Sequence, residues 1–161
     1  MIEARIAKKS EISKLPSIEK SADFLFEEAG IINLPPVASL EELRDANCIM
    51  VIGDPPKGFI RIDEVDNNAH IEQLSVKHNC MGEGLGSKLL EAATEWAKVK
   101  GYSQITLITF KNIPWNGPFY EKHGFWELSN IPDDLKKLRD HEKKRGLDSI
   151  DERIVMYNPL N

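Results

Sequence analysis

An alternating run breaks into a glycine-spaced turn between Ala69 and Ser87, and this stretch limits the possible folds more than any other. Alternation from Ala69 to Val76 predicts a strand, and apolar residues at helical spacing from Leu85 to Trp96 predict a helix. The glycines at 82, 84 and 86 lack a Cβ, so the backbone can turn tightly and bring its N–H groups against a ligand. Amides at a helix start bind phosphate. The stretch is therefore predicted to be a strand, an anion-binding turn and a helix.

Two well-known phosphate-binding motifs, the Walker loop and the dinucleotide fingerprint, do not fit this turn well. A Walker loop needs lysine directly after its last glycine, but Ser87 separates Gly86 from Lys88, so that interpretation fails. A dinucleotide fingerprint needs glycine at position 87 and an acidic residue about 20 positions later. The later strand predicted over Gln104–Phe110 offers no carboxylate, which leaves this interpretation weak.

The turn resembles the pyrophosphate loop of the GNAT superfamily of N-acetyltransferases, whose signature is Q/R-x-x-G-x-G/A entered directly from a strand. The segment Met81–Gly86 fits this signature at every place but the first. A second segment, PFYEKHGF at Pro118–Phe125, is similar to the family's FYxxxGF segment, and its PFY is found in the arylalkylamine type. The two motifs stand in the family's order, and the resemblance covers residues 48–128 well.

The resemblance implies an α/β (α+β) fold with a mixed, mostly antiparallel central sheet of about six to seven strands, flanked by helices. In the family this sheet is splayed between strands four and five, and CoA lies in the gap. The chain length predicts a single domain over residues 1–161, and the resemblance implies that it is an N-acetyltransferase domain. Its expected strands are Glu3–Ala7, Cys48–Ile52, Gly58–Val65, Ala69–Val76, Gln104–Phe110, a strand beginning at Phe125, and Arg153–Tyr157.

Helices are predicted on both sides of the glycine turn. Ser10 is expected to cap the first helix, and Ser39 a helix over Leu40–Ala46. The charged segment 132–145 predicts a solvated surface helix. Phe24 and Phe26 lie where the family builds its acceptor pocket, and a core position is the alternative for both.

Three residues are candidates for the chemistry of acetyl transfer. Residues i and i+2 of a strand share a face, so His70 and Glu72 form a pair of candidate bases. The resemblance implies that side chains at these positions deprotonate the amine, often through water. It also implies that Tyr120 protonates the departing CoA thiolate. The alternatives are that His70 has no catalytic function, that Glu72 is a solvated surface carboxylate and that water is the base. For Tyr120 the alternative is an aromatic residue that only packs.

The resemblance also assigns residues to the cofactor. Backbone groups of Leu74 and Val76 are expected to meet the pantetheine arm, and the amides of the turn to face the pyrophosphate. The cofactor residues expected in full are Leu74, Val76, Met81, Gly82, Glu83, Gly84, Leu85, Gly86, Ser87, Asn116 and Phe119. Met81 replaces the usual Gln or Arg, which removes one polar contact. Glu83 adds a negative charge, which the loop tolerates only if the side chain points to solvent.

The composition and net charge of the chain limit the classes of binding partner that are expected. The chain has 161 residues, a net charge of −5 and two cysteines. Nucleic acid and anionic membranes require a basic face, so neither is expected as a partner. Cys48 and Cys80 lack a zinc-binding pattern, so no metal is expected. Nothing resembles a signal peptide or a membrane span, which predicts a cytoplasmic protein.

These patterns and the resemblance together predict an acetyl-CoA-dependent N-acetyltransferase. The acetyl group is expected to pass to a primary amine by direct attack in a ternary complex. The acceptor is a small-molecule or peptide amine, and a homodimer is an open alternative to a monomer. The alternative function is a catalytically weak acyl-CoA-binding regulatory or sensor module, for which Met81 and Glu83 are the indications.

Overall fold

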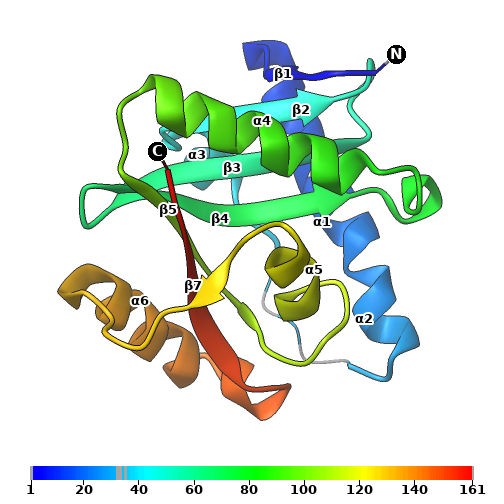
Figure 1. The fold of residues 1–161 in the computed structure, drawn as a ribbon. Coiled ribbons are helices and arrows are strands. Elements are labelled where there is room, and N and C mark those ends of the chain that lie inside the picture. The colour runs from blue at the N-terminus through cyan, green and yellow to red at the C-terminus, as the bar shows by residue number, and fades with distance from the viewer. Residues whose placement is uncertain (1, 32–33, 35, 161) are drawn as a thin grey trace. The chain divides into compact units, whose positions relative to one another are not determined.

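The computed structural model describes residues 2–31, 34 and 36–160, and Figure 1 labels their elements. The strands are β1 (Ala4–Ile6), β2 (Cys48–Ile52), β3 (Gly58–Val65), β4 (Asn68–Val76), β5 (Gln104–Phe110), β6 (Trp126–Glu127) and β7 (Arg153–Pro159). The α-helices are α1 (Leu15–Ala22), α2 (Phe24–Glu28), α3 (Leu40–Arg44), α4 (Leu85–Val99), α5 (Gly117–Lys122) and α6 (Asp133–Lys144). Short 3₁₀ helices are η1 (Lys9–Lys14), η2 (His78–Cys80) and η3 (Leu147–Ser149). Within these described ranges, no helix is long and apolar enough to cross a membrane.

The described residues form a seven-stranded sheet in the order β1-β2-β3-β4-β5-β7-β6. The pairs β1–β2, β2–β3, β5–β7 and β6–β7 are antiparallel. β4 and β5 are parallel over a short ladder from Ala69↔Ile105 to Ile71↔Leu107, and β5 continues to Phe110. The mixed, mostly antiparallel sheet predicted from the sequence is confirmed.

Close contacts within the chain define two compact units. The first comprises the chain up to Asp63 together with Glu72–Trp96. The second comprises Glu64–Ile71 and the chain from Ala97 onward. The single N-acetyltransferase domain expected over residues 1–161 stays a prediction.

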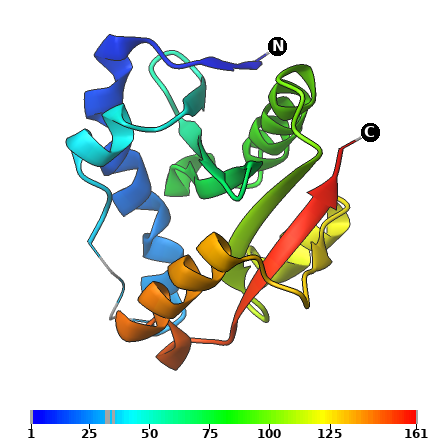
Figure 2. The ribbon, with the colours of Figure 1, turned by 90° about the vertical axis from the view of Figure 1, so that its left-hand side faces the viewer.

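In the first unit, helices cover both faces of β2 and β3. α1 and α3 lie against one face, and α4 lies across the other (Figures 1 and 2). β2 is therefore buried along its whole length, because successive side chains point to opposite faces. The core on the α1 side contains Leu15, Ile18, Leu43, Ile49, Val51 and Phe59. Each such side chain contributes about 1.5–3 kcal/mol when it is fully buried, so this core holds β2 and β3 firmly in place.

The first helical segment differs from the expected helix capped at Ser10. The chain forms η1 first, and α1 begins only after it. Glu11 explains the difference, because its carboxylate accepts the Lys8 N–H at 2.9 Å and two bonds of 2.8 Å from the Arg5 guanidinium. The Arg5 guanidinium holds the pKa of Glu11 at about 2. Pro16 then falls in the first turn of α1, where its missing N–H removes no helical bond.

In the second unit, β7 lies between β5 and β6. α6 lies on one face of the β5–β7 pair and α5 on the other (Figures 1 and 2). The two strands pair from Gln104↔Pro159 to Phe110↔Arg153. Buried side chains of this pair are Ile105, Leu107, Phe110, Ile154, Val155 and Met156. The long β5–β7 pairing and these buried side chains form a stable surface on which α5 packs.

α6 is attached more firmly than the solvated helix predicted from its charges. Its Leu135 is fully buried. Its Glu142 forms an ion pair of 2.9 Å with Arg153, the first residue of β7. Arg153 also stacks 4.5 Å from the centre of the Phe110 ring. The charged face of α6 thus contributes to the second unit and does not only meet solvent.

Candidate active site

The glycine-spaced turn lies between η2 and α4 in the first unit. Gly82 and Gly84 have φ values of 84° and 77°, in the left-handed region that residues with a Cβ rarely adopt. Chain neighbours aside, no heavy atom of the described chain lies within 4 Å of a Cβ built on either residue. These glycines are therefore required by their backbone conformation, and the space beside them is open.

The start of α4 supplies hydrogen-bond donors to this turn. The first amides of a helix have no acceptor within the helix, and the helix dipole adds positive potential there. The first turn of α4 carries no acidic side chain, and Glu83 just before it is exposed. Donors, dipole and open space together fit a phosphate or pyrophosphate group.

β4 leads into the turn close beside β3. A Cβ at Gly58 of β3 would lie 3.0 Å from the Ser75 carbonyl oxygen and 3.2 Å from Cγ2 of Val76. Leu74 and Val76, the predicted pantetheine contacts, are both half-buried. The separation between β3 and this end of β4 therefore depends on a glycine at position 58.

Tyr120, the predicted acid, lies on α5 in the second unit and is 7% exposed. Its ring makes edge-on contacts with Phe119 and Phe125, with centroids 5.2 and 5.7 Å away. Burial raises the pKa of the Tyr120 phenol above its usual value of 10, and the charge of Arg153 opposes the rise. The phenol is therefore protonated at neutral pH and able to donate its proton.

The start of α5 is tightly packed. A Cβ at Gly117 would overlap the Lys111 carbonyl oxygen and lie 3.0 Å from the Phe110 carbonyl oxygen. The preceding Asn116 accepts the Tyr120 N–H on its backbone oxygen at 3.1 Å. Its side-chain Oδ1 is buried and has no hydrogen-bond partner among the described residues. Asn116 thus presents an unused acceptor one turn before Tyr120.

The two candidate bases have different surroundings. His70 belongs to the second unit and is 2% exposed. Its Nδ1 lies 2.9 Å from Oγ1 of Thr106, its neighbour in the β4–β5 register. Glu72 belongs to the first unit and is exposed. The carboxylate of Glu72 therefore has ready access to water, whereas the imidazole of His70 is enclosed.

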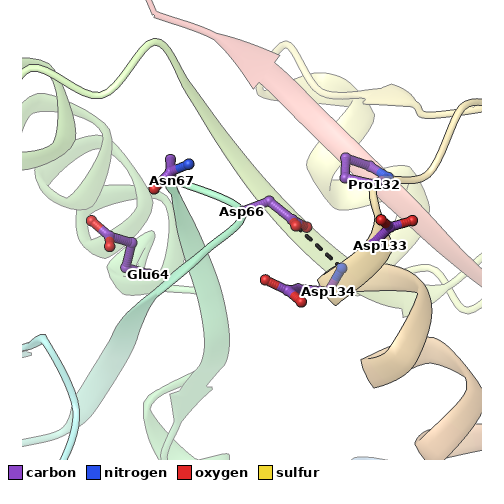
Figure 3. A pocket seen from close by; sticks show the side chains of 6 residues that line it. All are labelled: Glu64, Asp66, Asn67, Pro132, Asp133 and Asp134. Atoms are coloured by element: carbon purple, nitrogen blue, oxygen red, sulfur yellow. Dashed lines mark hydrogen bonds between the residues drawn. The ribbon is translucent and has the colours of Figure 1, made fainter.

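A separate acidic depression of about 610 Å³ lies in the second unit (Figure 3). It is lined by Glu64, Asp66, Asn67, Pro132, Asp133 and Asp134, and by none of the predicted catalytic or cofactor residues. The Asp66 carboxylate accepts the N–H groups of Asp134 and Leu135 at 3.1 and 3.0 Å, so it caps α6. Glu64 accepts the Tyr102 hydroxyl at 2.8 Å. Within residues 2–31, 34 and 36–160, no group of three or more His, Cys, Asp or Glu side chains can hold a metal ion. Two carboxylates of the depression thus have structural partners.

Comparison of the sequence with known protein families identifies the family of this chain. Residues 45–127, just over half of the chain, match the acetyltransferase (GNAT) domain family. The chain belongs to the GNAT acetyltransferase family. The resemblance inferred from the two motifs is thereby confirmed, and with it the enzyme class, an N-acetyltransferase that uses acetyl-CoA. The branch of the family and the amine acceptor stay predictions.

Solved structures of GNAT proteins share the fold. An acetyltransferase of the GNAT family from Staphylococcus aureus Mu50 matches with a TM-score of 0.76 and 20% identity, over 100% of both chains. The PaiA N-acetyltransferase from Thermoplasma acidophilum, solved with coenzyme A, matches with a TM-score of 0.70 and 16% identity over 99% of both chains. N-acetylglutamate synthase from Neisseria gonorrhoeae, solved with coenzyme A and N-acetyl-glutamate, has a TM-score of 0.72 and 17% identity. That match covers 100% of this chain and 35% of the synthase.

Sequence reasoning missed residues that support the two GNAT motifs. No prediction singled out Gly117, although a glycine between Asn116 and Pro118 is a strong sign of a sharp change in direction. Gly58 was treated as the ordinary start of a strand. No local pattern marks Arg153 as a neighbour of Tyr120, because β7 and α5 come together only in the folded chain.

Proposed function

We propose that this GNAT protein transfers the acetyl group of acetyl-CoA to a primary amine by direct attack in a ternary complex. The observation that carries the proposal is the open glycine turn at the start of α4, where Gly82 and Gly84 leave the backbone accessible. Bound acetyl-CoA supplies an activated thioester, which a neutral amine attacks with release of the CoA thiol. The net charge of −5 is compatible with attraction of a cationic amine.

The proposed cofactor contacts extend along one stretch of the first unit. Amides from Gly82 to Ser87 bind the pyrophosphate, supported by the dipole of α4. Backbone groups of Leu74 and Val76 bond to the pantetheine arm. The exposure of Glu83 keeps its charge in solvent, so this residue need not repel the pyrophosphate. Met81 is half-buried and adds no charge to the turn.

Asn116 and Phe119 of the second unit are the other proposed cofactor residues. The buried Oδ1 of Asn116 can accept a hydrogen bond from an amide N–H of the pantetheine arm. An unsatisfied buried acceptor costs about 1–3 kcal/mol, so a ligand donor at this atom would relieve a penalty already present in the folded chain. Phe119 contacts Tyr120 and His123, which fixes the ring beside the acid.

Tyr120 is proposed as the acid that protonates the leaving thiolate. Burial keeps its phenol protonated at neutral pH, and the charge of Arg153 stabilises the phenolate left after donation. The proton moves from the phenol oxygen to the CoA sulfur as the carbon–sulfur bond breaks. Solvent then returns a proton to the phenolate.

For the base we propose Glu72, acting directly or through water, because its carboxylate is exposed while His70 is enclosed and bonded to Thr106. The pH profile of kcat/KM tests this choice. Glu72→Gln should shift or abolish the acidic limb, and His70→Ala should leave the limb in place. The opposite pattern would assign the base to His70, and unchanged profiles in both variants would assign it to water.

Thiol trapping of released CoA against a panel of amines tests the proposed function. We expect CoA release to depend on a primary amine and initial-rate lines to intersect, as a ternary complex requires. The panel should include small amines, amino acids and peptides with free N-termini. Tight acetyl-CoA binding without amine-dependent release would instead identify a regulatory acyl-CoA-binding module.

A further inference from the structure

His78 lies at the junction between β4 and the glycine turn. It is the first residue of η2, and its carbonyl oxygen accepts the N–H of Met81 at 3.4 Å. Met81 directly precedes Gly82. This hydrogen bond therefore couples the position of the His78 backbone to that of Gly82.

Contacts from α1 and α2 hold His78 on its other side. Its backbone N–H donates to Oγ of Ser21 at 3.0 Å. Its ring meets the Phe24 ring edge-on, with centroids 4.6 Å apart and planes at 87°. Its Nε2 lies 3.5 Å from Oε1 of Glu28. All of these residues belong to the first unit, so the contacts lie within one compact body.

The exposure of α2 shows that these contacts are not part of the hydrophobic core. α2 contains no buried residue, and Phe24 is 44% exposed. Of the two sequence interpretations for Phe24, a core position is therefore wrong. The edge-on contact with the Phe24 ring fixes the orientation of the His78 ring.

The glycine turn cannot fix its own shape by packing. No side chain of the described chain would meet a Cβ at Gly82 or Gly84, and glycine has the widest conformational freedom of all residues. Its conformation must be set from its ends, by the start of α4 on one side and by η2 on the other. Within η2, His78 contacts both α1 and α2.

We propose that His78 is a positioning residue for acetyl-CoA: α1 and α2 hold it, and it holds the glycine turn in the conformation that accepts the pyrophosphate. The inference rests on the proposed function, since it requires the turn to bind acetyl-CoA. It assigns α2 a part in cofactor binding although α2 itself need not touch the cofactor.

Titration calorimetry of acetyl-CoA into His78→Ala tests the inference. The substitution removes the ring contacts with Phe24 and Glu28 and keeps the backbone bond to Ser21. We expect the Kd to rise about 5- to 10-fold, the size of an aromatic pair with a weak polar contact. The KM for acetyl-CoA should rise with it while kcat stays within about twofold of wild type. His141→Ala, the same change at an exposed histidine of α6, is the matched control and should leave the Kd unchanged.

Two further variants separate positioning from general destabilisation. Phe24→Ala should raise the Kd by most of that factor, and adding it to His78→Ala should have little further effect, because both substitutions remove the ring contact between Phe24 and His78. His78→Phe keeps an aromatic ring against Phe24 and should recover most of the affinity. General destabilisation would give additive effects and no recovery.

The outcomes are distinguishable. A Kd for His78→Ala within about twofold of wild type overturns the inference, and so does a lower melting temperature with an unchanged Kd. Failure of the wild-type protein to bind acetyl-CoA is a different result, because it overturns the proposed function itself.

Discussion

Gly84 in the first unit and Gly117 in the second each stand at the start of a helix, but they are glycines for opposite reasons. A Cβ at Gly84 would enter open space, and its φ of 77° is what favours glycine. A Cβ at Gly117 would overlap a backbone carbonyl oxygen of Lys111. At Gly84, the open space leaves backbone amides accessible to a ligand. At Gly117, the missing Cβ allows two backbone segments to come into contact. The comparison separates a glycine proposed to serve binding from one that positions Tyr120, the proposed acid.

The largest expected effect concerns Tyr120, which follows the crowded glycine on α5. Tyr120→Phe keeps the ring contacts with Phe119 and Phe125 but removes the proton donor. We expect kcat to fall roughly 10- to 1,000-fold, the range for loss of one positioned acid, with the acetyl-CoA Kd and the melting temperature unchanged. A kcat within about twofold of wild type, with chemistry rate-limiting, would mean that Tyr120 only packs.

The next effect is on stability and tests the crowding directly. Gly117→Ala should lower the free energy of unfolding by about 3 kcal/mol, because the backbone of Phe110 and Lys111 must move. Gly84→Ala, the matched change at an open position, should lower it by about 1 kcal/mol from backbone strain alone. Urea denaturation measures both. Equal losses at the two glycines would remove the distinction between them.

Two carboxylates of the first unit, Glu19 and Glu11, have pKa values shifted in opposite directions. Glu19 on α1 accepts the Ala38 N–H at 3.0 Å. Burial raises the pKa of Glu19 to about 7; the charges of Asp23 and Glu42 add to the rise, and the Ala38 N–H and the charge of Arg61 oppose it. Its folded pKa lies above the ordinary 4.5, so the folded state holds a proton that the unfolded chain releases. Its contribution is thus most favourable below pH 4.5 and is lost as the pH rises to about 7.

Glu19→Gln therefore gives the smallest of these effects. Between pH 5 and pH 8 the wild type should lose about 1–2 kcal/mol more unfolding free energy than the variant, a value reduced for the partial exposure of Glu19. Glu11 should show its effect in a different pH range. Arg5 holds the pKa of Glu11 at about 2, so the charge of Glu11 contributes equally at pH 5 and pH 8, and that contribution is lost as the pH falls from 4.5 toward 2. Urea titrations at both pH values measure the slopes. Identical slopes for wild type and Glu19→Gln would contradict this interpretation of Glu19.

Much of the fold follows from local patterns. The expected strands Cys48–Ile52, Gly58–Val65 and Gln104–Phe110 have the bounds found in the structure, because β-branched runs bounded by turn residues encode them directly. The cap at Ser39 is also confirmed, with its hydroxyl accepting the Glu42 N–H at 3.2 Å. These features depend on residues within one turn or one strand of each other.

Features that depend on distant residues were not predictable. Alternation placed His70 and Glu72 on one strand face and treated them alike, but the bond to Thr106 and the enclosure of His70 arise from pairing with β5. The charges of α6 predicted a solvated helix, because nothing local indicates that Arg153 would pair with Glu142. Glycine spacing predicted an anion-binding turn, but not that Gly117 is needed for contact between backbones. Local patterns thus predict where a site lies, and tertiary contacts determine the surroundings of each predicted residue.

The central claim is that the open glycine turn binds acetyl-CoA, and calorimetry of wild type beside Gly84→Val tests it most directly. We predict that the wild type binds acetyl-CoA and that the variant binds at least about 100-fold more weakly, a loss of about 3 kcal/mol, because a branched side chain fills the open space. Backbone strain at φ 77° should lower the melting temperature of the variant by several degrees, and a single cooperative unfolding transition would show that the fold is intact. Equal affinity of wild type and a folded Gly84→Val for acetyl-CoA would contradict the account.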